Sequence, residues 1–139
     1  MTEAPQGPAA GLTPHICIRD GRAAEAVDFY VRAFGAQEQR RMTADDGKRL
    51  LHAHLLINGA SLMLNDDFPE MRGGRPSGAP EAMVLHLQVD DADAWFARAA
   101  AAGAQVTMPL ADMFWGDRYG HVTDPFGFTW SIGAAIKGG

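Results

Sequence analysis

The sequence predicts an α+β fold made of two βαβββ repeats. Two identical tripeptides, Gly35-Ala36-Gln37 and Gly103-Ala104-Gln105, stand 68 residues apart, close to half the length of the 139-residue chain. Each ends a segment with helical periodicity, and each such segment follows a short apolar run that stops near an aspartate. Matching tripeptides in matching surroundings favour duplication of one unit over a chance match.

The first repeat is expected at about residues 12–65. A β-branched run at 12–19 ends in an Asp-Gly turn, and apolar side chains then recur at three- and four-residue steps over 22–34, which predicts a strand followed by a helix. A polar segment and two apolar runs follow. Asn58-Gly59 separates the two runs and predicts a hairpin between them.

The second repeat, at about residues 82–135, restarts the same pattern. An apolar strand at 83–89 leads into an alanine-rich helix at 90–102, and three further strand-like segments follow. Between the repeats, about residues 66–81 are rich in Gly and Pro and are expected to be a linker loop. Residues 1–11 hold little to bury and are expected to be a flexible arm.

Composition excludes several classes of protein. The chain is 47% hydrophobic and 21% charged, and it contains no apolar run near the roughly 20 residues that a membrane span needs. Its formal charge is −5 and it has no basic stripe, so nucleic acid is not an expected partner. Cys17 is the single cysteine, so no internal disulfide can form, and the start of the chain lacks the pattern of a signal peptide. A cytoplasmic location is therefore expected.

Two longer segments carry a family resemblance. Residues 13–36 read TPHICIRDGRAAEAVDFYVRAFGA, and residues 115–132 read WGDRYGHVTDPFGFTWSI. With these segments the chain resembles the vicinal oxygen chelate superfamily, which includes glyoxalase I, bleomycin-resistance proteins and extradiol dioxygenases, and within it the PhnB-like branch. The resemblance implies a glyoxalase-like fold, in which the two repeats form an open, eight-stranded, barrel-like cavity. It also implies a homodimer that completes this cavity.

The resemblance further implies four metal-ligand positions, typically His and Glu, one on each of four strands. Spacing places them at His15, Met63, Val84 and Ser131, with His86 two residues beyond the third. Of these four side chains only His15 suits a divalent ion, because thioether, alkyl and hydroxyl groups are poor ligands for it. We therefore expect no metal and no other cofactor.

The ligand-binding candidates are histidines, aromatic side chains and one arginine. They are His15, His54, Met63, His86, Trp115, Arg118, Tyr119 and Trp130. A cluster of aromatic residues beside a concave sheet could stack on a planar ligand, and an arginine in a Gly-bounded loop could reach an anionic or carbonyl group. The alternatives are that these aromatic residues belong to the core and that Arg118 only fixes its loop. Cys17 lies two residues from His15 and could pair with it as a nucleophile, but a buried cysteine is more often inert.

Three functions remain open from the sequence. The favoured one is binding of a small, partly planar or apolar molecule, without catalysis, in a cavity shared across a homodimer. The second is a lyase, isomerase or dioxygenase that uses a metal site not visible in the sequence. The third is a metal-independent enzyme in which His15, His54 or His86 acts as a general base. The fold alone does not choose between them, nor does the sequence decide whether the protein is an enzyme.

Overall fold

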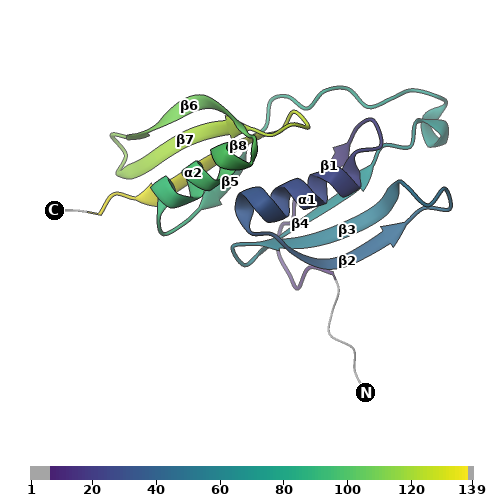
Figure 1. Cartoon of the computed structure of the whole chain (residues 1–139), viewed down its shortest axis with the longest axis horizontal. Coiled ribbons are helices and arrows are strands. Elements are labelled where there is room, and N and C mark those ends of the chain that lie inside the picture. The colour runs from purple at the N-terminus through teal and green to yellow at the C-terminus, as the bar shows by residue number, and fades with distance from the viewer. Residues whose placement is uncertain (1–6, 138–139) are drawn as a thin grey trace, which may run out of the picture. The chain divides into compact units, whose positions relative to one another are not determined.

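The computed structural model describes residues 7–137 and confirms the α+β fold with two βαβββ repeats (Figure 1). The first repeat contains β1 (His15–Ile18), α1 (Ala23–Phe34), β2 (Gln37–Thr43), β3 (Leu50–Ile57) and β4 (Ala60–Asp66). The second contains β5 (Leu85–Gln88), α2 (Ala92–Ala102), β6 (Gln105–Asp112), β7 (Asp117–Thr123) and β8 (Thr129–Ala135). For the arm expected at residues 1–11, residues 1–6 lie outside the described part of the chain.

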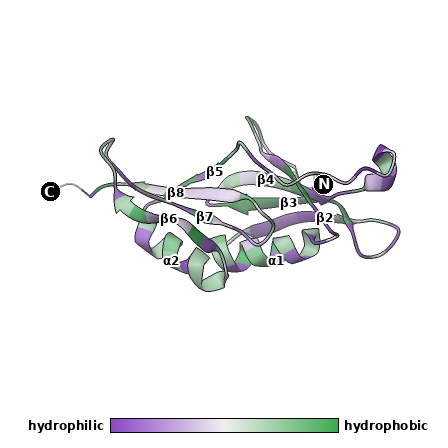
Figure 2. Cartoon of the chain, turned by 90° about the horizontal axis from the view of Figure 1, so that it is seen from above, coloured by the Kyte–Doolittle hydropathy of each residue, from purple (hydrophilic) through white to green (hydrophobic). Residues whose placement is uncertain are grey.

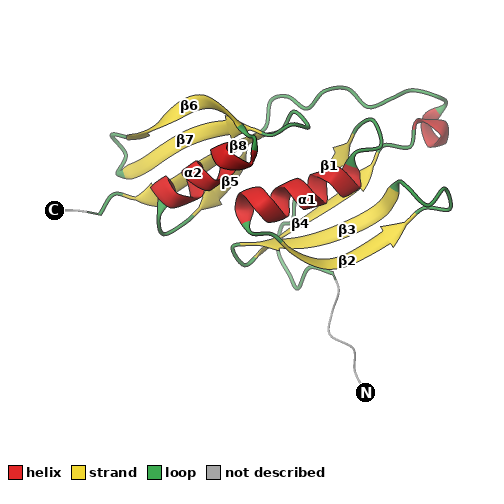
Figure 3. Ribbon diagram, viewed as in Figure 1, coloured by secondary structure: helices red, strands yellow, loops and turns green. Residues whose placement is uncertain are grey.

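The described residues divide into two compact units. The first contains residues 7–31 and 35–78, and the second contains residues 32–34 and 79–137. Each unit has its own four-stranded mixed sheet, and neither sheet closes on itself (Figure 3). The strand orders are β1-β4-β3-β2 and β5-β8-β7-β6, so the two repeats have the same topology. In both sheets the first and last strands of the repeat are parallel neighbours, and the other pairs are antiparallel.

In the first unit α1 covers one face of the sheet, as both views of this unit show (Figures 1 and 2). The helix ends at Gly35, whose φ of 64° gives the left-handed cap expected from the sequence. Asp66 is fully buried at the start of the helix. One of its carboxylate oxygens accepts a hydrogen bond from Ala23 N at 2.9 Å, and the other accepts one from Leu50 N at 2.7 Å. A single carboxylate thus joins α1, β3 and β4.

The hairpin expected at Asn58-Gly59 is present between β3 and β4. Both residues have positive φ, 49° and 85°, as a tight two-residue turn that follows the twist of its strands requires. On its other side, β3 pairs with the edge strand β2, all of whose residues are exposed. This strand carries the charged side chains Glu38, Arg40 and Arg41, which are typical of a solvent-facing sheet edge.

In the second unit α2 lies against β6, β7 and β8. Its N-cap residue Asp91 accepts a hydrogen bond from Ala94 N, and Gly103 ends the helix with a φ of 118°. The loop between the units contains a short 3-10 helix at Pro69–Arg72, whereas the sequence predicts only loop there. Among residues 7–137 no helix is long and apolar enough to cross a membrane.

Candidate functional site

A row of side chains crosses the open face of the first sheet, opposite the face that buries Ile16 and Leu64. His15 on β1 is the register partner of Met63 on β4, and Met63 is the register partner of His54 on β3. Three sequence-predicted candidates from distant parts of the repeat are therefore neighbours. The chain brings them together because residues opposite one another on adjacent strands point to the same side of the sheet.

Each histidine of this row has a polar neighbour. His15 Nε2 donates to the side-chain oxygen of Asn65 at 2.6 Å, and His54 Nε2 lies 2.8 Å from Ser61 Oγ. His52, on the same face of β3, has its ring centroid 6.2 Å from that of His15. Partial burial, followed by the charges of His15 and Arg40, lowers the pKa of His52. On this face an amide group therefore holds His15, and a hydroxyl group lies beside His54.

The second sheet carries an equivalent row. His86 on β5 pairs with Ser131 on β8, and Ser131 pairs with His121 on β7. By register, His86 therefore corresponds to His15, Ser131 to Met63, and His121 to His54. This corrects the position expected from spacing, because Val84 precedes β5 and His86 takes the third ligand position. The count failed because the connection from strand to helix differs in length between the two repeats.

His86 is fixed on both sides of its ring. Its Nε2 donates to Gln88 Oε1 at 2.8 Å, and in the neutral imidazole Nδ1 then accepts the hydroxyl hydrogen of Ser131 at 2.7 Å. The Tyr119 ring stacks on His86 with a centroid distance of 5.8 Å, and its hydroxyl lies 3.0 Å from His121 Nε2. Gly133 makes this stacking possible, since a Cβ there would lie 3.1 Å from the His86 ring and 3.3 Å from the Tyr119 ring.

Three other sequence-predicted candidates differ in their placement. Trp115 is half exposed and packs edge-to-face against Tyr119, with 5.4 Å between ring centroids. Trp130 is only 3% exposed, and its indole Nε1 donates to Asp124 Oδ2 at 2.9 Å. Arg118 forms ion pairs with Asp93 of α2 and with Asp112, both at 3.1 Å. Trp130 therefore packs in the core, and Arg118 fixes β7 to α2.

The four ligand positions do not fit a divalent metal ion. They supply the imidazoles of His15 and His86, the Met63 thioether and the Ser131 hydroxyl, and Ser131 is only 1% exposed. No carboxylate is present at these positions to offset the charge of the ion. In the described part of the chain, no three His, Cys, Asp or Glu side chains are grouped so that they could hold a metal.

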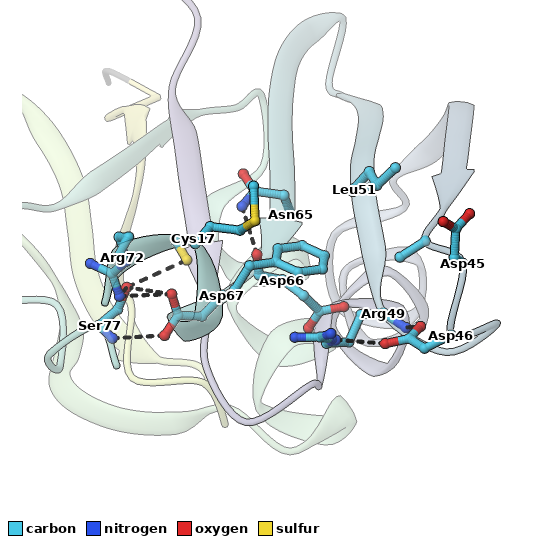
Figure 4. A pocket seen from close by; sticks show the side chains of 13 residues that line it. Cys17, Asp45, Asp46, Arg49, Leu51, Asn65, Asp66, Asp67, Arg72 and Ser77 are labelled. Atoms are coloured by element: carbon cyan, nitrogen blue, oxygen red, sulfur yellow. Dashed lines mark hydrogen bonds and ion pairs between the residues drawn. The ribbon is translucent and has the colours of Figure 1, made fainter. Parts of the chain in front are cut away.

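A cavity of about 730 Å³ opens in the first unit, next to the row that contains His15 (Figure 4). The register partners Cys17 and Asn65 line it from β1 and β4. One wall comes from β3 and the turn before it, and the opposite wall from the loop and 3-10 helix after β4. Its apolar lining consists of Ala44, Leu51, Phe68 and Met71, and its charged lining consists of Asp45, Asp46, Arg49, Asp66, Asp67 and Arg72, with Ser77 beside Cys17.

One wall of the cavity is held by a network around Asp67. Its carboxylate accepts hydrogen bonds from Ser77 N at 2.7 Å and from Arg72 Nη2 at 2.8 Å. These contacts, the backbone N–H of Ser77 first, lower the pKa of Asp67. The Cys17 thiol lies 3.7 Å from Ser77 Oγ, and partial burial raises its pKa. The thiol is therefore protonated at neutral pH and is a poor nucleophile.

A second network, around Arg49, links the two walls. Its guanidinium donates to Asp46 Oδ2 at 2.7 Å and to both oxygens of Glu70, at 3.0 and 2.6 Å. It also lies over the Phe68 ring, 4.4 Å from the centroid. The contacts with Arg49, together with the backbone N–H groups of Lys48 and Arg49, lower the pKa of Asp46 to about 2.

Sequence reasoning missed most residues of this cavity. Cys17 is considered there only as a nucleophile, and the wall residues Phe68, Met71 and Ser77 lie in a segment treated as linker. One signal was available, because an aromatic residue and a methionine inside a Gly- and Pro-rich loop are unusual for a solvated linker. Phe68 meets Arg49 from the turn before β3, and Ser77 meets Cys17 of β1, which only the folded chain shows.

Comparison with known proteins agrees with this architecture. A model of the Glyoxalase/Bleomycin resistance protein/Dioxygenase superfamily matches residues 13–132. The uncharacterized protein Rv0887c of Mycobacterium tuberculosis is 50% identical over 132 residues, which cover 91% of this chain and 75% of that protein. The crystal structure of PA1353 from Pseudomonas aeruginosa is 26% identical with a TM-score of 0.74, covering 91% of this chain and 98% of that one.

A PhnB-like structure shares the fold as well. It is a putative 3-demethylubiquinone-9 3-methyltransferase, PhnB protein, from Bacillus cereus, 20% identical with a TM-score of 0.67, and the match covers 91% of this chain and all of that one. At this identity the similarity shows the fold and not the activity. The match to the family model spans both repeats, from the residue before Pro14 to the middle of β8. The chain therefore belongs to the glyoxalase/bleomycin resistance protein/dioxygenase superfamily.

Proposed function

We propose that this protein binds a small, partly planar or apolar molecule in the cavity of its first unit, without a metal ion of the glyoxalase type. The observation that carries the proposal is the cavity itself. Its volume of about 730 Å³ falls within the range of roughly 300–1,000 Å³ usual for small-molecule sites. Leu51, Phe68 and Met71 offer an apolar surface.

The state of the histidines favours binding over catalysis by a histidine base. A general base needs a ring nitrogen with a free lone pair within reach of the substrate. Both ring nitrogens of His86 are hydrogen-bonded, and the partner of Nδ1 is buried. His54 is itself buried. His15 donates from Nε2 to Asn65 and keeps the lone pair on Nδ1, but no histidine is among the residues that line the cavity. The metal-dependent alternative lacks carboxylate ligands at the four expected positions.

A fluorescence titration tests the binding proposal. N-phenyl-1-naphthylamine is an uncharged, partly planar dye whose emission rises in apolar surroundings, and we expect it to bind the wild-type chain. Leu51 is 51% exposed, so Leu51→Asn should leave the fold intact and weaken dye binding about fivefold by removing apolar contact. Met71→Gln, at a side chain 79% exposed, should weaken it in the same direction.

The matched control is Met83→Gln, because Met83 is also exposed and does not line the cavity. It should bind the dye as the wild type does. Dye binding that is unchanged by Leu51→Asn and Met71→Gln, or lost equally in all three variants, would contradict the cavity as the binding site.

We also propose that the protein is a homodimer. The open face of each sheet supports this proposal, since an open sheet face in a small domain is usually covered. Light scattering at micromolar concentration should give a mass close to twice 14.9 kDa. A measured mass equal to that of one chain would contradict the dimer. It would not affect the binding proposal, because the residues of a single chain line the cavity.

A further inference from the structure

We propose that the cavity of the first unit discriminates against anions and accepts ring systems that carry no negative charge. This inference rests on the proposed binding function and adds the chemical class of the ligand. It follows from how the charged side chains around the cavity are paired.

Both cations at the cavity are already in contact with carboxylates. Arg49 is held by two carboxylates, Asp46 and Glu70, the second through both of its oxygens. Its flat face is covered by Phe68. Arg72 uses one Nη2 for Asp67, for the Arg75 carbonyl and for Ser77. An anionic ligand would have to compete with carboxylates already in contact with these guanidinium groups.

The remaining charge at the cavity is negative. Four aspartates and two arginines line it, and Glu70 adds a further carboxylate next to Arg49. The Asp66 charge is satisfied by Ala23 N and Leu50 N. Asp45 makes no hydrogen bond or ion pair with any of the residues that the structure describes. A bound sulfonate, phosphate or carboxylate would therefore meet net repulsion, because the carboxylates around the cavity outnumber its two guanidinium groups.

A matched pair of dyes tests the charge preference. N-phenyl-1-naphthylamine and 8-anilinonaphthalene-1-sulfonate share the anilinonaphthalene ring system and differ by one sulfonate. We expect the Kd of the uncharged dye to be about tenfold lower than that of the sulfonate, which corresponds to an unfavourable charge term of about 1.4 kcal/mol. Because the repulsion is electrostatic, the ratio should fall as the salt concentration rises from about 0.01 to 1 M.

A variant that removes one carboxylate and keeps its volume separates the effect of charge pairing at Arg49 from the effect of cavity shape. Glu70→Gln leaves Arg49 with only Asp46 as a charged partner, and the amide keeps nearly the same volume. We expect this variant to bind the sulfonate several-fold more tightly than the wild type and to bind the uncharged dye equally well. Glu81→Gln is the matched control, because it removes the same charge from an exposed residue that does not line the cavity.

The outcomes separate the two proposals. If the wild type binds the sulfonate as tightly as the uncharged dye, or if Glu70→Gln and Glu81→Gln change sulfonate binding equally, the charge preference is wrong and the binding function stands. If the uncharged dye does not bind, or if Leu51→Asn does not weaken it, the binding function is wrong and this inference falls with it.

Discussion

His86 and Ser131 are register partners on β5 and β8, and His86 Nδ1 accepts the hydroxyl hydrogen of Ser131 at 2.7 Å. In the first sheet the corresponding pair is His15 and Met63, where a thioether cannot donate. The two repeats thus keep a histidine at the same place on their first strands and differ in what it faces. Ser131 is buried, so the hydroxyl orients the ring and does not meet a ligand.

Replacing Ser131 with alanine should destabilise the second unit. The substitution removes the partner of His86 Nδ1 and should lower the free energy of unfolding by about 1–2 kcal/mol. Urea denaturation measures this change. A double-mutant cycle with His86→Ala should show a coupling energy of about 1 kcal/mol. If the two substitutions add to within about 0.3 kcal/mol, the hydrogen bond does not stabilise the fold.

Asp66→Asn should lower the free energy of unfolding more than the same substitution does at a helix cap on the surface. Both carboxylate oxygens of Asp66 accept backbone hydrogens in a fully buried place, and an amide would turn one acceptor into a donor facing an N–H. We expect a loss of about 2 kcal/mol or more in the free energy of unfolding. Asp91→Asn is the control at the N-cap of α2, where asparagine caps about as well as aspartate. Equal losses in the two variants would contradict the role assigned to Asp66.

The free energy of unfolding should fall in acid, because protonation of Asp46 and Glu70 breaks their ion pairs with Arg49. The pKa of Asp46 is lowered from its ordinary 3.8 to about 2, and the pKa of Glu70 is lowered by the same arginine. A carboxyl group whose pKa is lower in the folded than in the unfolded chain stabilises the fold. This contribution is complete above the unfolded-state pKa and is lost as the pH falls through the folded-state pKa. The decline should therefore lie between about pH 4.5 and pH 2.

Thermal unfolding at a series of pH values checks this. Asp46→Asn should show a shallower fall of Tm over that window than the wild type, because its contribution is already absent. The neighbouring Asp45→Asn removes the same charge from a residue outside the network and should keep the wild-type slope. If both substitutions reduce the slope of Tm against pH equally, the effect comes from the loss of one negative charge and not from the pairing of Asp46 with Arg49.

Cys17 should report occupancy of the cavity. Its raised pKa keeps the thiol protonated, so carbamidomethylation by iodoacetamide at pH 7 should be slower than for a free cysteine. It is the single cysteine of the chain, so mass spectrometry of the intact protein measures its modification directly. Saturating N-phenyl-1-naphthylamine should slow the reaction further. An unchanged rate with the dye bound would place the dye outside the cavity.

The elements of this fold could be read from the sequence because their signals are local. The Asn58-Gly59 hairpin, the helices ending at Gly35 and Gly103, and the repeated tripeptide each depend on a few adjacent residues with defined backbone preferences. Local periodicity also identified His15, His54, Met63 and His86 as residues of strands or their immediate neighbours. It could not give the register between strands, which depends on the lengths of the connections.

That register is what the tertiary structure decided. It placed His86 rather than Val84 opposite Ser131, and it put Trp130 in the core, where its indole meets Asp124. It also turned part of an apparent linker into a cavity wall, because Asp67 holds Ser77 and Arg72 close to Cys17. The sequence by itself determined the order and type of the elements through short-range backbone and hydrophobic preferences. The site required contacts between residues 50 or more positions apart, such as His15 with Asn65 and Cys17 with Ser77, and these form only when the strands pair and the loop folds back.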